Sequence, residues 1–497
     1  MSSAAVSLAL AQRLGLAQTL SRIGPERLRF GALDPLVDLL QETPADDLLP
    51  LLVQRLRGGT PLADLVAAGA LANARAHGGT NYNGYHALMA LMPSYEMAAQ
   101  MPAPYEALPV LKVLHRNARF FQESGRTHED ALGPLGPVED AAEGPGLVEN
   151  VRARDLPLAE RSLAVLEARG AAGDRLHAYE ELQTVVRDDM NVHRVVLAWR
   201  AYDLLRLTGP EHSVTMMRMP VRFCIDEDGA SAKRGQAPNA IRALLPELMA
   251  EHGLERSERG SRKADEAWIE GLADTVFAAP RADAARAVAA ALAEGCDPED
   301  VGAALSLAAT RLLLHDPGQA KASPGRPAGS VHGATVGVHA SDAANAWRHI
   351  ARAGSAANAC ASLIAGAFHT AGQSGAVGAL AHDHDAQPCA LEEPRALLGE
   401  IDARVRAGDQ KGACQAARRY DALGHSSDDL FALLLGFAVS EDGALHAEKY
   451  FRTAQEEHAS ARPAHRPLYL VALTRVMASH YGFPAPGCEE ARKLLAG

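Results

Sequence analysis

The stretch VHGATVGVHASDAANAWRH (331–349) carries three histidines among small residues that follow a helical spacing. Alanine is the strongest helix former, so the stretch predicts a helix. His332 and His339 are seven residues apart and share one face if the helix begins early enough, whereas Asp342 and His349 belong to another face. Small side chains around His339 favour the close approach of either a substrate or a neighbouring helix.

Helical periodicity extends over most of the 497 residues, including 84–100, 174–206 and 443–459. Aromatic residues make up only 5% of the chain, and strand-like alternation is almost absent. The one exception, 213–222, fits an extended segment or a helix equally well. No repeat of solenoid type is visible. We therefore expect an all-α protein, a large irregular multi-helix domain with little or no sheet.

The domain organisation predicted from the pattern has two parts. Residues 1–76 are expected to form an N-terminal helical extension, and residues 77–497 the main helical domain. Segments rich in glycine, proline or charge predict loops at 133–146, 257–263 and 317–329.

Composition argues against several classes of partner. The chain has 49 Lys and Arg against 61 Asp and Glu, a net charge of −12, and no basic run, which argues against binding to nucleic acid. The longest apolar run, 431–439, is far too short to span a membrane, so no membrane partner is expected. The N-terminus lacks the basic region of a signal peptide, and the six cysteines form no CxxC pair. A cytoplasmic location is therefore expected.

Histidine is the most informative residue type in this chain. The short signatures of nucleotide enzymes, serine hydrolases and zinc proteases are missing, whereas 20 histidines are present. Imidazole is both the acid or base of neutral pH and the commonest metal ligand in proteins. A histidine-based site is therefore the chemistry to look for.

Two candidates lie in the first half of the chain. His86 is surrounded by apolar residues in YHALMALM (85–92), as expected of a buried site residue or of a core histidine bonded to a backbone carbonyl. His193 follows Asp189 by four residues, a spacing that places both on one helical face. Asp189 is then expected to orient the imidazole, as carboxylates do for metal ligands. An exposed surface pair is the other interpretation.

A third candidate is the face formed by His446, Lys449, Tyr450 and Thr453. A solvated helix face is one interpretation of this spacing. A lysine turned inward instead loses its charge, and the neutral amine can add carbon dioxide to form a carbamate, an oxygen ligand for a metal. Lys449 and Tyr450, together with Asp189, are therefore candidate catalytic residues.

These segments together resemble the questin oxidase-like family, which has an HALxAL-type helix early, a VHAxTxANAxR-type helix late and an EHAIK-type helix near the end. The corresponding segments here are YHALMAL (85–91), VHASDAANAWR (338–348) and LHAEK (445–449), and VHRVVLAW (192–199) is similar to a fourth. Carried over residue by residue, the resemblance implies a non-haem iron(II) held by His86, His193, His339, His446 and a carboxylated Lys449. His332 is the alternative to His339.

The resemblance implies an oxidoreductase, an iron-dependent oxygenase that acts with dioxygen on an apolar aromatic or polyketide-like small molecule. Four imidazoles and one carbamate leave one position of an octahedral ion open, which favours iron over structural zinc. The need for an external reductant stays open. Methionines are expected to line an adaptable substrate pocket; these are Met89, Met92, Met97, Met216, Met217 and Met219. The alternative function is that of a non-catalytic helical interaction protein whose histidines belong to the core.

Overall fold

The computed structural model describes residues 27–136, 146–170, 176–323, 326–332, 335–378 and 389–497. Within these residues the chain forms helices and three isolated β-bridges, and no strand. The all-α fold expected from the sequence is confirmed. None of the described helices is long and apolar enough to cross a membrane, and a cytoplasmic location stays a prediction.

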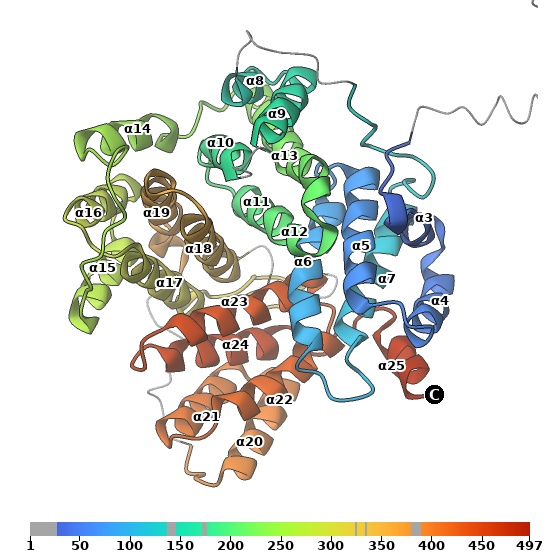
Figure 1. The fold of residues 1–497 in the computed structure, drawn as a ribbon. Helices are drawn as coiled ribbons and strands as arrows, with labels where there is room; N and C mark the ends of the chain where they lie inside the picture. The colour runs from blue at the N-terminus through green and yellow to red at the C-terminus, as the bar shows by residue number, and fades with distance from the viewer. Residues whose placement is uncertain (1–26, 137–145, 171–175, 324–325, 333–334, 379–388) are drawn as a thin grey trace, which may run out of the picture.

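The α-helices follow one another along the whole chain (Figure 1). In chain order they are α3 (Asp34–Glu42), α4 (Ala45–Arg57), α5 (Leu62–His77), α6 (Tyr82–Ala98), α7 (Leu108–Glu123), α8 (Leu147–Ala153), α9 (Leu156–Gly170), α10 (Leu176–Val186), α11 (Val192–Asp203), α12 (Leu205–Thr208), α13 (Ser213–Lys233), α14 (Ile241–Glu251), α15 (Glu266–Ala278), α16 (Arg281–Ala293), α17 (Pro298–His315), α18 (Val336–Ala353), α19 (Ala356–Thr370), α20 (Pro394–Arg406), α21 (Gln410–Ala422), α22 (Ser427–Ser440), α23 (His446–Ser460), α24 (Arg466–His480) and α25 (Cys488–Ala496). Short 3-10 helices are Gly31–Leu33, Pro210–His212, Ser374–Ala376 and Gly443–Leu445.

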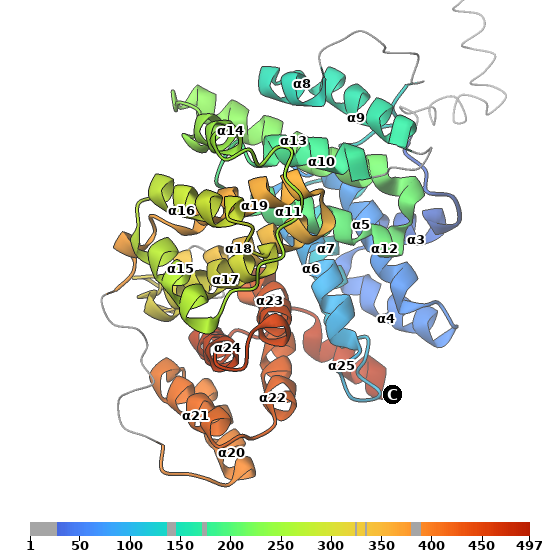
Figure 2. The ribbon, with the colours of Figure 1, turned by 60° about the vertical axis from the view of Figure 1, so that its left-hand side comes forward.

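Three groups of helices surround the middle of the molecule (Figures 1 and 2). The blue N-terminal helices α3 to α7 share one large apolar core with α23 and α24 near the C-terminus. Helices α14 to α17 and α19 enclose a second apolar core. Helices α20 to α22 pack against α24. Helix α25, at the C-terminal end, lies against α4 and α7 from the first quarter of the chain.

Four helices from distant parts of the chain meet in the middle of the fold. Helix α6 packs against α11, α11 against α18, α18 against α23, and α23 against α6. The four helices therefore form a closed ring of contacts. Each carries one of the histidines singled out in the sequence, so the fold places these residues around a common centre.

Two helix boundaries differ from the sequence-based expectation. The single helix expected over 174–206 is interrupted, because α10 ends at Val186 and α11 begins at Val192, where Asn191 caps it by accepting a hydrogen bond from a backbone N–H. Helix α18 begins at Val336, after His332. The ambiguous stretch 213–222 is the start of helix α13.

The expected loops and domain boundary can be compared with the structure in part. Residues 257–263 are outside helices, as predicted. The described parts of 133–146 and 317–329 are also non-helical, whereas 137–145 and 324–325 lie outside the described residues, as do 1–26. The boundary drawn between residues 76 and 77 falls inside the last turn of α5. Helices α3 to α5 pack into the same core as α6 and α7.

Close packing of α17 and α18 generates the first prediction. A Cβ atom added at Gly337 would lie 2.4 Å from the Cα of Leu313, a contact that backbone must move to relieve. We expect Gly337→Ala to lower the free energy of unfolding by about 1–3 kcal/mol. Gly436→Ala is the matched control, because Gly436 is exposed within α22 and its added Cβ would meet nothing within 4 Å. That substitution should stabilise by about 0.5–1 kcal/mol. Urea unfolding followed by circular dichroism measures both, and equal effects would contradict the prediction.

Candidate metal centre

The ring of four helices brings four imidazoles together. Ring centroids are separated by 4.7 Å for His86 and His193, 5.5 Å for His193 and His339, 5.5 Å for His339 and His446, and 5.1 Å for His446 and His86. Each imidazole therefore touches two others, and the four form a closed cluster, which we call the histidine cluster. These are the four histidines that the sequence motifs select.

Burial makes these imidazoles neutral at physiological pH. His86 and His446 are buried, whereas His193 and His339 are half-buried. Loss of hydration lowers the pKa of His193 to about 3, and it lowers the pKa of each of the other three well below its ordinary value. The positive charge of Lys449 acts in the same direction on all four. Neutral imidazole is the form that binds metal ions.

Backbone carbonyls determine the tautomer of the two buried rings. Nδ1 of His86 lies 2.7 Å from the carbonyl oxygen of Tyr82, and Nδ1 of His446 lies 3.2 Å from that of Ala444. A carbonyl oxygen only accepts hydrogen bonds, so Nδ1 must carry the hydrogen in both rings. The lone pair of each neutral ring is therefore on Nε2.

The side chain of Asn191 determines the tautomer of His193 in the same way. Oδ1 of Asn191 accepts from the backbone N–H of His193 at 2.9 Å and lies 3.1 Å from Nδ1 of the same residue. The backbone N–H identifies this end of the amide as the oxygen. Nδ1 of His193 is thus the donor, and its Nε2 carries a lone pair.

Two lone pairs consequently face each other. Nε2 of His193 lies 3.1 Å from Nε2 of His86, and neither atom has a hydrogen to share. Such a contact is repulsive unless a cation lies beside both atoms. Two Nε2 atoms bound to one ion at about 2.1 Å lie about 3.0 Å apart at a right angle and about 3.4 Å apart at the tetrahedral angle. The observed separation suits two ligands of one metal ion.

The other two rings approach the same geometry. Nε2 of His339 and Nε2 of His446 are buried, and neither has a hydrogen-bond partner in the described part of the chain. Imidazoles on one ion have centroids about 4.6–5.3 Å apart, which is close to the centroid separations in the histidine cluster. Among the described residues, no three His, Cys, Asp or Glu side chains already have their donor atoms arranged to hold a metal ion. Closing the cluster on an ion therefore requires the rings to shift.

Lys449 lies beside the histidine cluster, one helical turn after His446. Its side chain is 3% exposed, so the solvated-face interpretation is wrong. Burial lowers the pKa of Lys449 to about 8, although the nearby Asp342 opposes this shift. Asp342 accepts a hydrogen bond of 2.8 Å from the hydroxyl of Thr453, and burial raises its pKa to about 6. A buried amine of reduced basicity is what carbamate formation requires, and the carbamate itself stays a prediction.

Asp189 does not orient His193, and the prediction that the two share a helical face is wrong. The reason is that α11 begins at Val192, so the i,i+4 relation does not apply. Oδ1 of Asp189 instead accepts from the side chain of Asn239 at 2.8 Å and from the backbone of Met190. Asn191 takes the orienting position. Its place two residues before His193, at a helix N-cap, is the sequence signal that would have identified it.

The remaining candidates are also placed by the structure. Tyr450 is buried in α23, where burial and the carboxyl of Asp342 raise the pKa of its hydroxyl, and its catalytic role stays a prediction. His332 lies outside the histidine cluster. Its centroid is 5.6 Å from that of His446 and 4.4 Å from that of His480. His339 contacts two members of the cluster and His332 contacts one, so the geometry favours His339 as a ligand.

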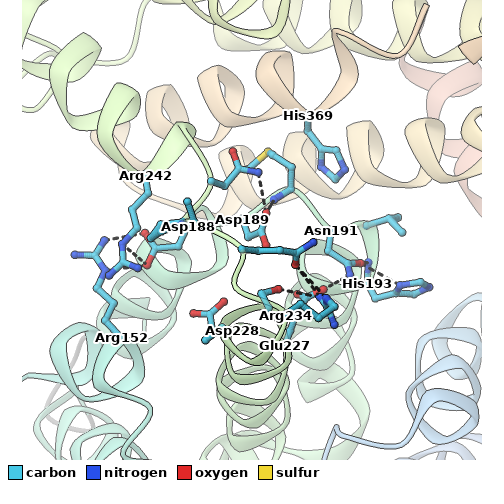
Figure 3. Close-up of a pocket in the computed structure, with 18 of the residues that line it drawn as sticks. Arg152, Asp188, Asp189, Asn191, His193, Glu227, Asp228, Arg234, Arg242 and His369 are labelled. Atoms are coloured by element: carbon cyan, nitrogen blue, oxygen red, sulfur yellow. Dashed lines mark hydrogen bonds and ion pairs between the residues drawn. The ribbon is translucent and has the colours of Figure 1, made fainter. Parts of the chain in front are cut away.

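Two cavities reach opposite sides of the histidine cluster. A cleft of about 840 Å³ reaches His193 and His339, and a small cavity of about 190 Å³ reaches His86 and His446. The wall of the large cleft carries four arginines and four acidic residues. Figure 3 labels three of the arginines, Arg152, Arg234 and Arg242. None of the six methionines expected to line the cleft does so. All six are buried in the apolar core, so that prediction is wrong.

Comparisons of the chain with protein-family models, with curated proteins and with solved structures found no match. The resemblance to questin oxidase-like proteins therefore stands on the four quoted motifs. The geometry of the histidine cluster is an independent observation, because it depends on packing between helices that those motifs do not describe.

Loss of a ligand generates the second prediction. We expect His446→Ala and His339→Ala each to remove bound iron while leaving the helical circular dichroism signal near that of the wild type, because ligand loss affects metal affinity more than it affects a large core. His332→Ala is the control and should retain iron. Metal content is measured after anaerobic loading with Fe(II). Iron retained by both ligand variants would exclude this site.

Lys449 generates the third prediction. We expect ¹³C-bicarbonate to give a carbamate resonance in the wild type, stronger at pH 8 than at pH 6.5, because only the neutral amine reacts and its fraction falls as the pH drops below the pKa of about 8. Lys449→Ala and Lys449→Arg should lose the resonance and most of the iron, since guanidinium stays protonated. Lys449→Glu should retain part of the iron through its own oxygen ligand. Full iron content in Lys449→Arg would remove Lys449 from the site.

Proposed function

We propose that this protein is a non-haem iron-dependent oxygenase that uses dioxygen to oxidise an aromatic or polyketide-like small molecule. The observation that carries the proposal is the contact of 3.1 Å between Nε2 of His86 and Nε2 of His193, both neutral and both with their hydrogen on Nδ1. Without a cation this contact is unfavourable. With one it becomes two ligand bonds.

The chemistry of the donor set favours iron among the common metals. Imidazole nitrogen suits iron, copper, nickel and zinc, and an added oxygen ligand from a carboxylated Lys449 favours the harder of these ions. Four nitrogens and one oxygen exceed the four ligands at which structural zinc closes. An iron ion supplies the one-electron chemistry by which dioxygen reacts with an organic molecule.

The protein's own groups would orient the ligands and limit access by water. Hydrogen bonds at Nδ1 fix three of the rings with the lone pair on Nε2. His86 and His446 are buried and border only the small cavity, whereas His193 and His339 border the large cleft. The organic substrate would therefore bind on the side of His193 and His339.

The cleft adds a requirement to the substrate class. Its wall contains ion pairs, such as Arg152 with Asp188 at 2.8 Å, beside a few apolar contacts from Met190, Pro238 and Ala340. A fully apolar molecule would remove water from these charged groups and offer no hydrogen bond in exchange. The substrate we propose is thus an aromatic molecule with hydroxyl or carbonyl groups at its edge.

The alternative is a non-catalytic helical protein with core histidines. Unpartnered ring nitrogens do not separate the two alternatives, because among the described residues His77, His332 and His480 also have them. The contact of 3.1 Å between Nε2 of His86 and Nε2 of His193 is what favours the metal site. Metal-free protein whose melting temperature does not change on iron loading or chelation would support the alternative.

Oxygen consumption tests the proposed function. Protein loaded anaerobically with one equivalent of Fe(II) is mixed with air-saturated buffer and a panel of hydroxylated aromatic compounds. We expect substrate-dependent oxygen uptake that falls at least a hundredfold in His193→Ala. His349→Ala is the matched control, because His349 stacks on Trp199 with centroids 4.6 Å apart and lies outside the histidine cluster. Equal activity in both variants would exclude the proposed site.

A further inference from the structure

A chain of polar contacts links the histidine cluster to helix α13. The side-chain amide nitrogen of Asn191 donates to Oε1 of Glu227, and Oδ1 of the same amide faces Nδ1 of His193. Figure 3 shows Asn191 between Glu227 and His193, and all three residues line the large cleft. The guanidinium of Arg194 lies 3.8 Å from Oε2 of Glu227 on the other side.

Each contact in this chain has one allowed direction. A carboxylate only accepts hydrogen bonds, so the end of Asn191 that faces Glu227 must be its NH₂ group. The opposite end is then the oxygen, which makes Nδ1 of His193 the donor and leaves the lone pair on Nε2. A reversed amide would place NH₂ against Nδ1, and the hydrogen of the neutral ring would have to move to Nε2. That tautomer cannot bind a metal through Nε2.

We propose that Glu227 is a positioning residue for the metal centre: through Asn191 it holds His193 in the tautomer whose Nε2 can bind the ion. This inference rests on the proposed function for its metal, but the tautomer is a property of the metal-free protein. No sequence motif pointed to Glu227, which lies on another helix.

The surroundings of Glu227 suit this role. Arg194 is buried, donates to Asp228 at 2.6 Å and to the carbonyl oxygen of Val185 at 3.0 Å, and so is anchored on both sides. Its positive charge opposes the effect of burial, which raises the pKa of Glu227. The carboxylate therefore lies beside a fixed positive charge 3.8 Å from its Oε2, and its hydrogen bond is the one that Oε1 accepts from the amide of Asn191.

Metal affinity tests the inference. The dissociation constant for Fe(II) is measured anaerobically for Glu227→Ala, Glu227→Gln and the control Asp226→Asn. We expect Glu227→Ala to weaken binding by about tenfold. Glu227→Gln should stay within about threefold of the wild type, because its carbonyl oxygen can still accept from Asn191. Asp226→Asn should change little, since Asp226 is exposed on the same helix and its loss removes one charge only. A glutamine variant as weak as the alanine variant would show that charge acts instead, and would overturn the positioning role.

A double-mutant cycle tests whether Glu227 acts through Asn191. Asn191→Ser keeps a capping hydroxyl for α11 and removes the amide. The double variant Asn191→Ser with Glu227→Ala should bind Fe(II) as Asn191→Ser alone does, within about twofold. Additive losses would overturn the inference, because they would mean independent roles.

The tautomer is read directly in metal-free protein. With ¹⁵N-labelled histidine, and with His193→Ala to assign the resonance, His193 should be protonated at Nδ1 in the wild type and shift toward Nε2 in Glu227→Ala. An unchanged tautomer in Glu227→Ala would overturn the inference. If the wild type bound no iron while the tautomer shifted as expected, the proposed function would fail and the control of the His193 tautomer by Glu227 would stand.

Discussion

The arrangement at the centre of this fold depends on the contact between Nε2 of His86 and Nε2 of His193. Both rings have already used Nδ1 as a donor, one to a backbone carbonyl and the other to Asn191, so the two remaining lone pairs face each other at 3.1 Å. Burial keeps both rings neutral. Packing of the surrounding helices must therefore hold two mutually repelling atoms together, which is a cost that a cation bound to both atoms would remove.

Sequence patterns predicted the helical fold and selected the four imidazoles, for different physical reasons. Helices follow from local spacing and from alanine and leucine, which is why periodicity alone identified the all-α class. The gathering of His86, His193, His339 and His446 is a long-range property that spacing cannot supply, and here the family-like motifs selected the residues. Burial of Lys449 was one of two interpretations left open by the sequence, and packing of α23 against α6 and α18 decides it.

What the sequence did not predict depends on where helices begin and on which side chains meet between them. Asp189 was assigned to His193 because the helix was expected to continue through 174–206, and the N-cap at Asn191 changes that register. Glu227 reaches Asn191 from α13, a contact that no local pattern records. The expected methionine-lined pocket was wrong because those side chains face the core, while the cleft wall is formed by polar residues of loops and helix ends.

The neighbouring positions of His86 and His446 have a consequence for how the protein is made. One residue lies on the early helix α6 and the other on the late helix α23, and their rings touch. A nascent chain on the ribosome therefore has an incomplete centre until nearly all of its helices have been synthesised. Uptake of the proposed ion would then belong to the end of folding, and an ion that binds only the finished centre would stabilise the native state against reopening between its first and last parts.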